Sequence, residues 1–516
     1  MKTYEEAIGY GELELVSPYD VQTLHDLSLF HTVNDHARLS ITGMIPEDKK
    51  DRCMQLASSF DRIELYQTKD GQRVRCLFKG QITEMAIRTV RGIYQIELEA
   101  ISSTFRLDCK KIARSFQNDK MTYTGMLDQV LANYSGADVI DVASKGTPLK
   151  QFILQYKETD WQFLKRMASH FRTVLVPAVD ADTPKLWFGL PDGRAEELPD
   201  DWYTITKDRS IYLHTAHNDL EHPMEEKDGV TYVIEAKKPL LVGDRVRIQN
   251  KELIVAKTMA CMKQGVLTYE YHLVTEAGIR QGRLNAPLLP GASLDGKVLE
   301  VKQDKVRLHL AIDESQKKEE ATWFPLATLY TAEGHSGFYC PPEIDDTVQL
   351  AFPNHREETA IVRRSIRKSG NTNPKTADPK TAYWGTPRGK EFKLDPQSVV
   401  VTAKEGATFL KIHQETGIEV HSNHPIVLTA SDDITFSGKT IAMSAGESLR
   451  FTCGSSSLVL DGITDIQGQI VEMDGSIKAP VSISTTTEDD DDDDDDDDFE
   501  QGLDVIGMIP LAGGGA

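Results

Sequence analysis

The chain has 516 residues, which is too many for one hydrophobic core, so we expect several domains. With 40% hydrophobic and 27% charged residues, its composition excludes disorder over most of its length. The formal net charge of −22 excludes nucleic acid as the main partner, because binding to phosphate requires clusters of Lys and Arg. Ten of these negative charges are the consecutive aspartates Asp489 to Asp498.

Cysteine spacing and hydropathy indicate the compartment. The six cysteines lie far apart without a CxxC pair, which is typical of reduced, buried thiols rather than of disulfides or a metal site. The N-terminal residues lack an apolar signal core, and no stretch approaches the roughly 20 apolar residues that span a bilayer. We therefore expect cytoplasmic synthesis, and export only by a route other than general secretion.

Residues 1–110 predict a first β-module that resembles a barrel. Alternating apolar and polar residues mark strands at 37–45, 62–68, 74–83 and 94–102. A helical pattern from about 48 to 59 interrupts these strands.

Residues 111–184 predict a helical insertion in mixed structure. One helix is expected at 122–134. A second follows Thr159, whose hydroxyl can cap its first turn, and its apolar face holds Trp161, Leu164, Met167, Ala168 and Phe171.

Strand patterns resume in a second β-module at 185–284. Gly, Pro and Asn then become frequent near 280–291, which reads as a connection. Five short strand patterns within 285–368 predict a small barrel of the OB type. A linker at 369–390 follows, then a repetitive region at 391–484, and finally an acidic spacer with an apolar tail at 485–516.

Pairs of apolar residues two positions apart recur in the repetitive region. The pairs start 8, 8, 7, 8 and 9 residues apart and alternate with polar or Gly-containing turns. Each repeat therefore has room for one short strand with two inward side chains, so we expect a β-helix or β-prism needle. The predicted core consists of Ile418, Val420, Ile426, Leu428, Ile434, Phe436, Ile441, Met443, Leu449, Phe451, Leu458 and Leu460.

The short repeat also predicts the oligomeric state. About eight residues cannot wrap a whole three-sided turn in one chain. Burying the twelve core side chains is worth roughly 18 to 36 kcal/mol per chain at ~1.5 to 3 kcal/mol each, which a lone ribbon could not gain. A lone ribbon would also expose an apolar face and unpaired edges. We therefore expect a homotrimer whose three chains wind together.

The order of these modules resembles the VgrG-type spike of type VI secretion and related contractile systems, which is itself similar to the hub and needle of phage tails. The resemblance covers about residues 10–480 and includes the segments ETDWQFLKRMA and GVLTYEYHLV. In the OB-like segment 322–354, Asp345 stands where the family often has Gly, and Phe324 and Pro325 replace a polar alternation.

This resemblance implies a mainly β protein that punctures target envelopes and delivers cargo. Three copies of the two β-modules would form a pseudo-six-fold hub that fits a tail tube, in contact with baseplate and sheath-type proteins. The needle would meet a target membrane transiently, after assembly in the cytoplasm and delivery outside the cell or into a target cell. The resemblance implies no cofactor, no metal and no catalytic residue.

Two groups of histidines invite a metal hypothesis. The segment 214–222 contains His214, His217, Asp219, Glu221 and His222, but the zinc patterns HExxH and CxxC are absent, and a solvated loop is the preferred interpretation. His421 and His424 fall in a turn of the repeats, where three symmetry-related copies could meet at the axis or lie at outer corners.

Two alternative functions stay open from the sequence. A phage-type tailspike acting on surface polysaccharide would need a wide β-helix with two acids at fixed separation, and the short repeat does not suit one. A purely structural baseplate component would share the fold but carry no cargo. The linker at 369–390 is too short to hold the lysozyme domain that some phage needles carry at this position.

The last residues predict a site for cargo. The aspartate run repels itself and is expected to be an extended, solvated spacer. The segment LDVIGMIPLAGG that follows resembles the short apolar leader ahead of toxin domains in polymorphic effectors. We expect the natural chain to continue beyond it, or a separate effector or tip protein to attach at Phe499, Val505, Ile506, Met508 and Ile509.

Overall fold

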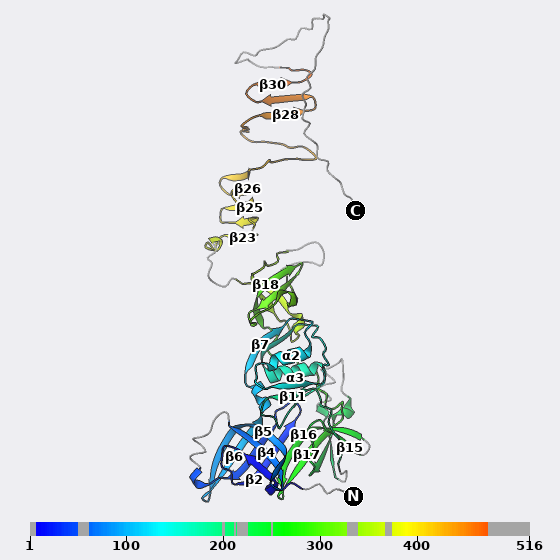
Figure 1. Ribbon diagram of the computed structural model, residues 1–516. Coiled ribbons are helices and arrows are strands. Elements are labelled where there is room, and N and C mark those ends of the chain that lie inside the picture. Colours follow the sequence, from blue (N-terminus) through cyan, green and yellow to red (C-terminus); the bar gives the residue numbers. More distant parts are fainter. Residues whose placement is uncertain are drawn as a thin grey trace, which may run out of the picture. The chain divides into compact units, whose positions relative to one another are not determined.

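The computed structural model describes residues 7–49, 61–198, 202–210, 213, 225–248, 251–327, 339–366, 374–386 and 388–472. The chain divides into two compact units, Met1–Thr372 and Asn373–Ala516. The mainly β fold predicted from the sequence is confirmed (Figure 1). The helical pattern expected at 48–59 lies outside the described residues except for its first two positions.

The strands of the two expected β-modules join in one large sheet rather than in two separate barrels. Its order is β1-β4-β5-β6-β3-β2-β16-β17-β14-β13, with β15 paired to β16 and β12 paired to β15. The modules meet where β2 and β16 run antiparallel, with His31 opposite Thr258. The strands are β1 (Leu13–Val16), β2 (Thr23–Thr32), β3 (Arg38–Met44), β4 (Arg62–Lys69), β5 (Gln72–Val90), β6 (Ile93–Ser102), β12 (Ala195–Glu197), β13 (Thr204–Lys207), β14 (Val230–Ala236), β15 (Arg245–Ile248), β16 (Lys251–Lys263) and β17 (Val266–Val274).

Alternation along these strands places one set of side chains in a common core. In β17, Leu267, Tyr269, Tyr271 and Leu273 are buried and the residues between them are less so. The same core includes residues from both modules. The hub, by which we mean the described residues within 7–102 and 195–279, therefore has one common core.

The insertion contains the α-helices α2 (Tyr123–Leu131) and α3 (Asp160–His170), as the sequence predicted. Helix α3 begins where expected because the Thr159 hydroxyl accepts a hydrogen bond from the Gln162 amide at 3.1 Å. The Thr159 amide in turn donates to the Gln162 side-chain oxygen at 3.2 Å, which completes a capping box. Trp161, Leu164 and Met167 are buried.

The insertion also has two small sheets. Strands β7 and β9 pair antiparallel, and β10-β11-β8 form a three-stranded sheet in which β11 and β8 are parallel. These strands are β7 (Lys111–Phe116), β8 (Asp138–Asp141), β9 (Ile153–Thr159), β10 (Leu175–Pro177) and β11 (Lys185–Phe188).

Short 3-10 helices along the described chain are η1 (Tyr10–Glu12), η2 (Glu47–Lys49), η3 (Ser103–Asp108), η4 (Glu226–Gly229), η5 (Lys318–Glu320), η6 (Glu357–Thr359) and η7 (Pro374–Thr376).

All five strands expected in the OB-like segment are present, in the order β20-β19-β18-β21-β22. One parallel bridge between Leu326 and Val362 connects the outer strands, and the sheet is otherwise open at that point. Asp345, which stands where the family often has Gly, has a φ of 70°. This φ lies in the left-handed region that favours glycine. The strands are β18 (Ser293–Lys302), β19 (Lys305–Leu310), β20 (Trp323–Pro325), β21 (Thr347–Ala351) and β22 (Ile361–Ser365).

The second unit consists of short antiparallel strands that follow one another along the chain (Figure 1). Strands β23 to β27 form one meander and β28 to β30 another. They are β23 (Ala382–Gly385), β24 (Glu391–Leu394), β25 (Ser398–Lys404), β26 (Thr408–His413), β27 (Gly417–Ser422), β28 (Leu449–Cys453), β29 (Ser456–Leu460) and β30 (Thr464–Gln467).

Within the described ranges, none of the helices has the length and apolar character that crossing a bilayer would require.

Candidate functional site

The apolar residues predicted to form the needle core are mostly exposed in the single chain. Ile418 and Val420 of β27 are 72% and 60% exposed, and Ile434 and Phe436 are 49% and 59% exposed. One chain therefore does not bury this set. The other exposed members are Ile426, Leu428, Ile441, Met443, Phe451 and Leu460, whereas Leu449 and Leu458 are half-buried.

Bends of the backbone separate the apolar pairs at regular intervals. They fall at 423–424, 431–432, 438–439 and 446–447. The residues at these bends are small or polar, including Ser431, Gly438 and Gly446, which can adopt a sharp change of direction with little steric cost. Each bend therefore ends one straight segment with two apolar side chains and starts the next.

The segments between the two meanders have no backbone partner among the residues that the structure describes. Residues 424–448 are all described, yet they form no strand and no backbone–backbone hydrogen bond with another described residue. The sequence predicted one strand in every repeat, and for these residues the single chain does not form it. The physical reason is that an extended segment becomes a strand only beside a neighbour that accepts and donates its hydrogen bonds.

We call residues 424–448 the unpaired segment. It combines exposed apolar pairs, which are unfavourable in water, with unpaired backbone groups, which can pair with another chain. This combination makes the unpaired segment the strongest candidate for a surface that other chains complete.

The histidines of the repeats do not form a metal site within one chain. The His421 ring stacks on Phe409 of β26, with 5.2 Å between ring centroids. The His424 amide donates to the Ser422 hydroxyl at 3.1 Å. In the part of the chain that the structure describes, no three His, Cys, Asp or Glu side chains gather as a metal would require.

Two groups of predicted residues lie outside the described residues. One is the acidic and histidine-rich cluster His214, His217, Asp219, Glu221 and His222. The other is the expected cargo attachment, Phe499, Val505, Ile506, Met508 and Ile509.

A chain of polar groups that the sequence did not reveal connects the hub and η3. The His36 Nε2 atom lies 3.6 Å from Asp108, and its Nδ1 atom lies 2.9 Å from the Thr104 hydroxyl, which in turn lies 3.0 Å from the Ser102 hydroxyl. The order of groups resembles that of a hydrolase triad. However, His36, Thr104 and Ser102 are at most 3% exposed and the His36 ring packs on Trp161. A substrate cannot reach these hydroxyls, so the network holds α3 against the hub.

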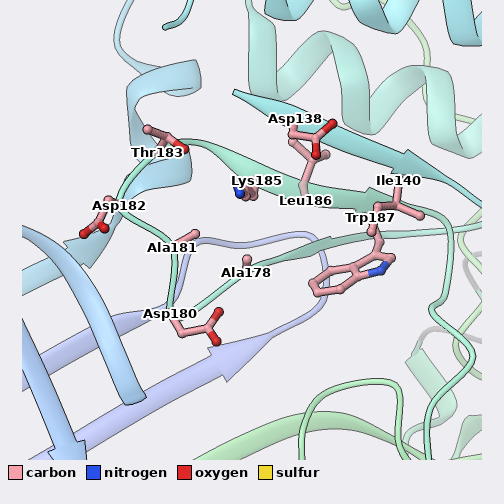
Figure 2. Close-up of a pocket in the computed structure, with 10 residues that line it drawn as sticks. All are labelled: Asp138, Ile140, Ala178, Asp180, Ala181, Asp182, Thr183, Lys185, Leu186 and Trp187. Atoms are coloured by element: carbon pink, nitrogen blue, oxygen red, sulfur yellow. The ribbon is translucent and has the colours of Figure 1, made fainter. Parts of the chain in front are cut away.

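A hollow of about 590 Å³ lies on the outer side of β8 and β11. Figure 2 shows Trp187 and Ile140 at one side of it and Asp180 and Asp182 at the other. The loop with these carboxylates is fixed to the hub, because Lys79 Nζ lies 3.1 Å from Asp182. Its lining includes the Thr183 hydroxyl and the Lys185 amine but neither histidine nor cysteine.

The comparisons with known proteins agree with this architecture. Residues 294–366 match the family model of the type VI secretion system/phage-baseplate injector OB domain. The Francisella PdpA–VgrG complex in its half-lidded form aligns with a TM-score of 0.51 and 10% identity, covering 77% of this chain and 83% of that chain. The lidless PdpA–VgrG complex aligns with a TM-score of 0.50 and 10% identity, covering 77% of this chain and 93% of that chain.

A third structure has a lower TM-score. The E. coli c3393 protein is described as a component of the type VI secretion system with structural similarity to the T4 bacteriophage tail proteins gp27 and gp5. It aligns with a TM-score of 0.48 and 14% identity, covering 69% of this chain and 99% of that chain. A sequence search among curated proteins finds no match.

The resemblance predicted from the order of modules is thus confirmed at the level of the fold. The chain has the fold of a VgrG-type spike, with an injector OB domain of the type VI secretion and phage-baseplate class at residues 294–366.

Proposed function

We propose that the chain is the hub-and-spike subunit of a contractile injection machine and acts as a homotrimer. The observation that carries this proposal is the unpaired segment, in which exposed apolar pairs coincide with a backbone that has no partner in the described part of its own chain. Neighbouring copies would supply both the apolar contacts and the hydrogen bonds. The VgrG fold and the injector OB domain support the same proposal.

Three copies suit the repeat better than a single chain. Each straight segment between bends carries two apolar side chains, enough for one side of a small core but not for a whole turn. Rotational symmetry allows three such sides to close around an axis, so that no strand edge remains free. The inward side chains of the three copies then form one continuous apolar column.

The hub and the needle would serve different partners. We infer that three hubs stack on a tail tube within a baseplate, and that the needle leads when the machine contracts and punctures the target envelope. The role is mechanical, and no catalytic residue is assigned to it. The subunit would assemble in the cytoplasm and end outside the cell or in a target cell.

Cargo or a tip protein would attach beyond the needle. The Francisella structure is that of a PdpA–VgrG complex, so one protein of this fold forms a complex with another protein. In the present chain we assign attachment to the apolar residues Phe499, Val505, Ile506, Met508 and Ile509 after the aspartate run. Pull-down of neighbouring gene products with and without residues 499–516 tests this assignment, and equal recovery from both forms would contradict it.

Native mass spectrometry of the full chain tests the trimer. We expect a mass three times that of the 57.6 kDa chain. A chain that ends at residue 422 keeps the first meander but lacks the unpaired segment, and we expect it to yield far less trimer at equal concentration. A folded full-length monomer at micromolar concentration would contradict the proposal.

A further inference from the structure

Arg166 is a buried cation at the contact between the insertion and the OB sheet. It lies on α3 and is 2% exposed. Its guanidinium donates to Glu158 at 2.8 Å, to Glu357 at 2.6 Å and to the Leu154 carbonyl at 2.7 Å. Glu158 belongs to β9 of the insertion, whereas Glu357 belongs to η6 between β21 and β22 of the OB sheet. One side chain therefore connects two parts of the chain that are 191 residues apart.

A bulge in β9 places Glu158 for this contact. Lys157 has a φ of 53°, and the pairing of β7 with β9 shifts between Ile112 and Ala113. A bulge of this kind turns the next side chain to a new direction. Glu158 becomes buried as a result, while Lys157 stays exposed.

The connection between the hub and the OB sheet is also held along its length. Gln281 accepts a hydrogen bond from Asn34 of the hub at 3.0 Å and donates one to the Lys165 carbonyl of α3 at 3.1 Å. The Leu284 amide donates to the Ser169 hydroxyl of α3 at 2.9 Å. Although the composition of 280–291 is that of a linker, the segment is attached to the hub through the Gln281 side chain and to α3 through Gln281 and the Leu284 amide.

The OB sheet shares its core and its polar contacts with the insertion. Phe152 and Leu154 pack with residues of β18, β19 and β21, and the Phe152 ring lies 5.0 Å from that of Phe324. Ala286 and Leu289, from the end of the connection, are buried in the same core. The Ser115 amide donates to Asp313 at 2.8 Å.

We propose that two features make the hub, the insertion and the OB sheet one rigid body that transmits force. They are the ion cluster of Arg166, Glu158 and Glu357 and the attached connection at residues 280–291. Thrust on the hub would then reach the OB sheet without bending at residues 280–291. The rigidity is inferred from contacts within one chain, whereas the transmission of thrust rests on the proposed function.

The cluster suits this role because it resists partial opening. Separating the OB sheet from the insertion would leave Arg166 with Glu158 but strip Glu357 of its cation. A buried carboxylate without its partner is strongly destabilising, so an intermediate hinge angle is disfavoured. The bidentate contact with Glu158 also fixes the direction of the guanidinium.

Pulsed electron paramagnetic resonance between two labels measures the bending. One spin-labelled non-natural residue replaces Glu84 in the hub and another replaces Lys305 in the OB sheet, both exposed positions. Labelled chains are diluted with unlabelled ones, so that distances within one chain dominate. We expect a narrow distribution in the parent protein and at least a twofold broader one after Arg166→Met.

Two further variants keep the test decisive. Glu357→Gln removes one charge with little change in shape, and it should broaden the same distribution even if Arg166→Met fails to fold. Arg307→Met is the matched control, because the Arg307–Glu300 ion pair at 3.1 Å lies within the OB sheet, and the distribution should stay narrow. A second label pair at Glu84 and Lys263, both in the hub, should be unchanged in every variant. Equal widths for the parent and Glu357→Gln would overturn the proposal, whether or not the protein proves to be part of an injection machine.

Discussion

Replacing both Ile434 and Phe436 by Asp in one chain tests whether the apolar pairs point inward. In the single chain these side chains are 49% and 59% exposed, so assembly can still bury about half of each. Full burial is worth about 1.5 to 3 kcal/mol per side chain, which leaves roughly 1 kcal/mol for each to gain. Two positions in three chains therefore lose on the order of 6 kcal/mol of assembly free energy.

The introduced carboxylates add a second, larger cost. Three symmetry-related pairs of Asp would be desolvated without cations, at several kcal/mol per buried ion unless they bind protons. Assembly of this region should therefore fail at neutral pH and recover in part at low pH. Thr435→Asp is the matched control, because Thr435 lies between the two apolar positions and alternation directs it outward.

The assay is the fraction of trimer that survives SDS at increasing temperature. We expect the Ile434→Asp, Phe436→Asp chain to lose resistance at every temperature, whereas Thr435→Asp keeps most of it. If the doubly substituted chain forms trimers as resistant as those of the parent, the side chains do not point toward the axis and the reasoning is wrong.

Substitutions at three other positions test the fold of the first unit. Trp161→Ala should cost about 3 to 5 kcal/mol in urea unfolding, because this side chain is 2% exposed in the insertion core, and a loss below 1 kcal/mol would contradict that packing. Asp345→Val should cost about 1 to 2 kcal/mol because its φ is 70°, while Asp345→Gly should stay within about 1 kcal/mol of the parent, and equal stability of both variants would refute the left-handed turn. Burial lowers the pKa of His31 from 6.5 to about 4. Between these two pH values the unfolded state binds more protons than the folded state. The free energy of unfolding therefore decreases by about 3 kcal/mol as the pH falls from 6.5 to 4. His31→Gln keeps a donor for the Pro177 carbonyl and should remove this share of the pH dependence, and an unchanged slope in urea titrations across that range would argue against a buried neutral imidazole.

Local patterns were enough to predict some elements of the first unit. Thr159 followed by an apolar helical face gave the start of α3, because the cap and the periodicity act within a few residues. Strand alternation likewise gave the five strands of the OB sheet. The joining of the two β-modules through β2 and β16 could not be read in this way, since pairing between residues more than 200 apart leaves no local pattern.

The same limit explains what was missed near the insertion. Nothing in the sequence near Arg166 indicates that Glu357 will neutralise it, and a bulge at Lys157 has no composition signal of its own. The residues at 280–291 have the composition of a loop, but their hydrogen bonds to Asn34, Lys165 and Ser169 depend on the folded hub and helix.

The repeats show the opposite case, because the sequence predicts strands that a single chain does not form by itself. The spacing of Ile426, Ile434 and Ile441 predicts strands, but the backbone around them pairs with none of the other residues that the structure describes. A pattern of inward apolar side chains indicates that these side chains are buried, but it does not indicate which chain covers them. The exposed apolar pairs are therefore where the single chain is incomplete.

Amide hydrogen exchange over residues 425–447 in the assembled protein tests the central claim most directly. If neighbouring chains complete the strands, these amides should be protected for hours, as slowly exchanging as those of β16 and β17 in the hub. Exchange within seconds, in a sample that native mass spectrometry identifies as trimeric, would contradict pairing between chains in the needle.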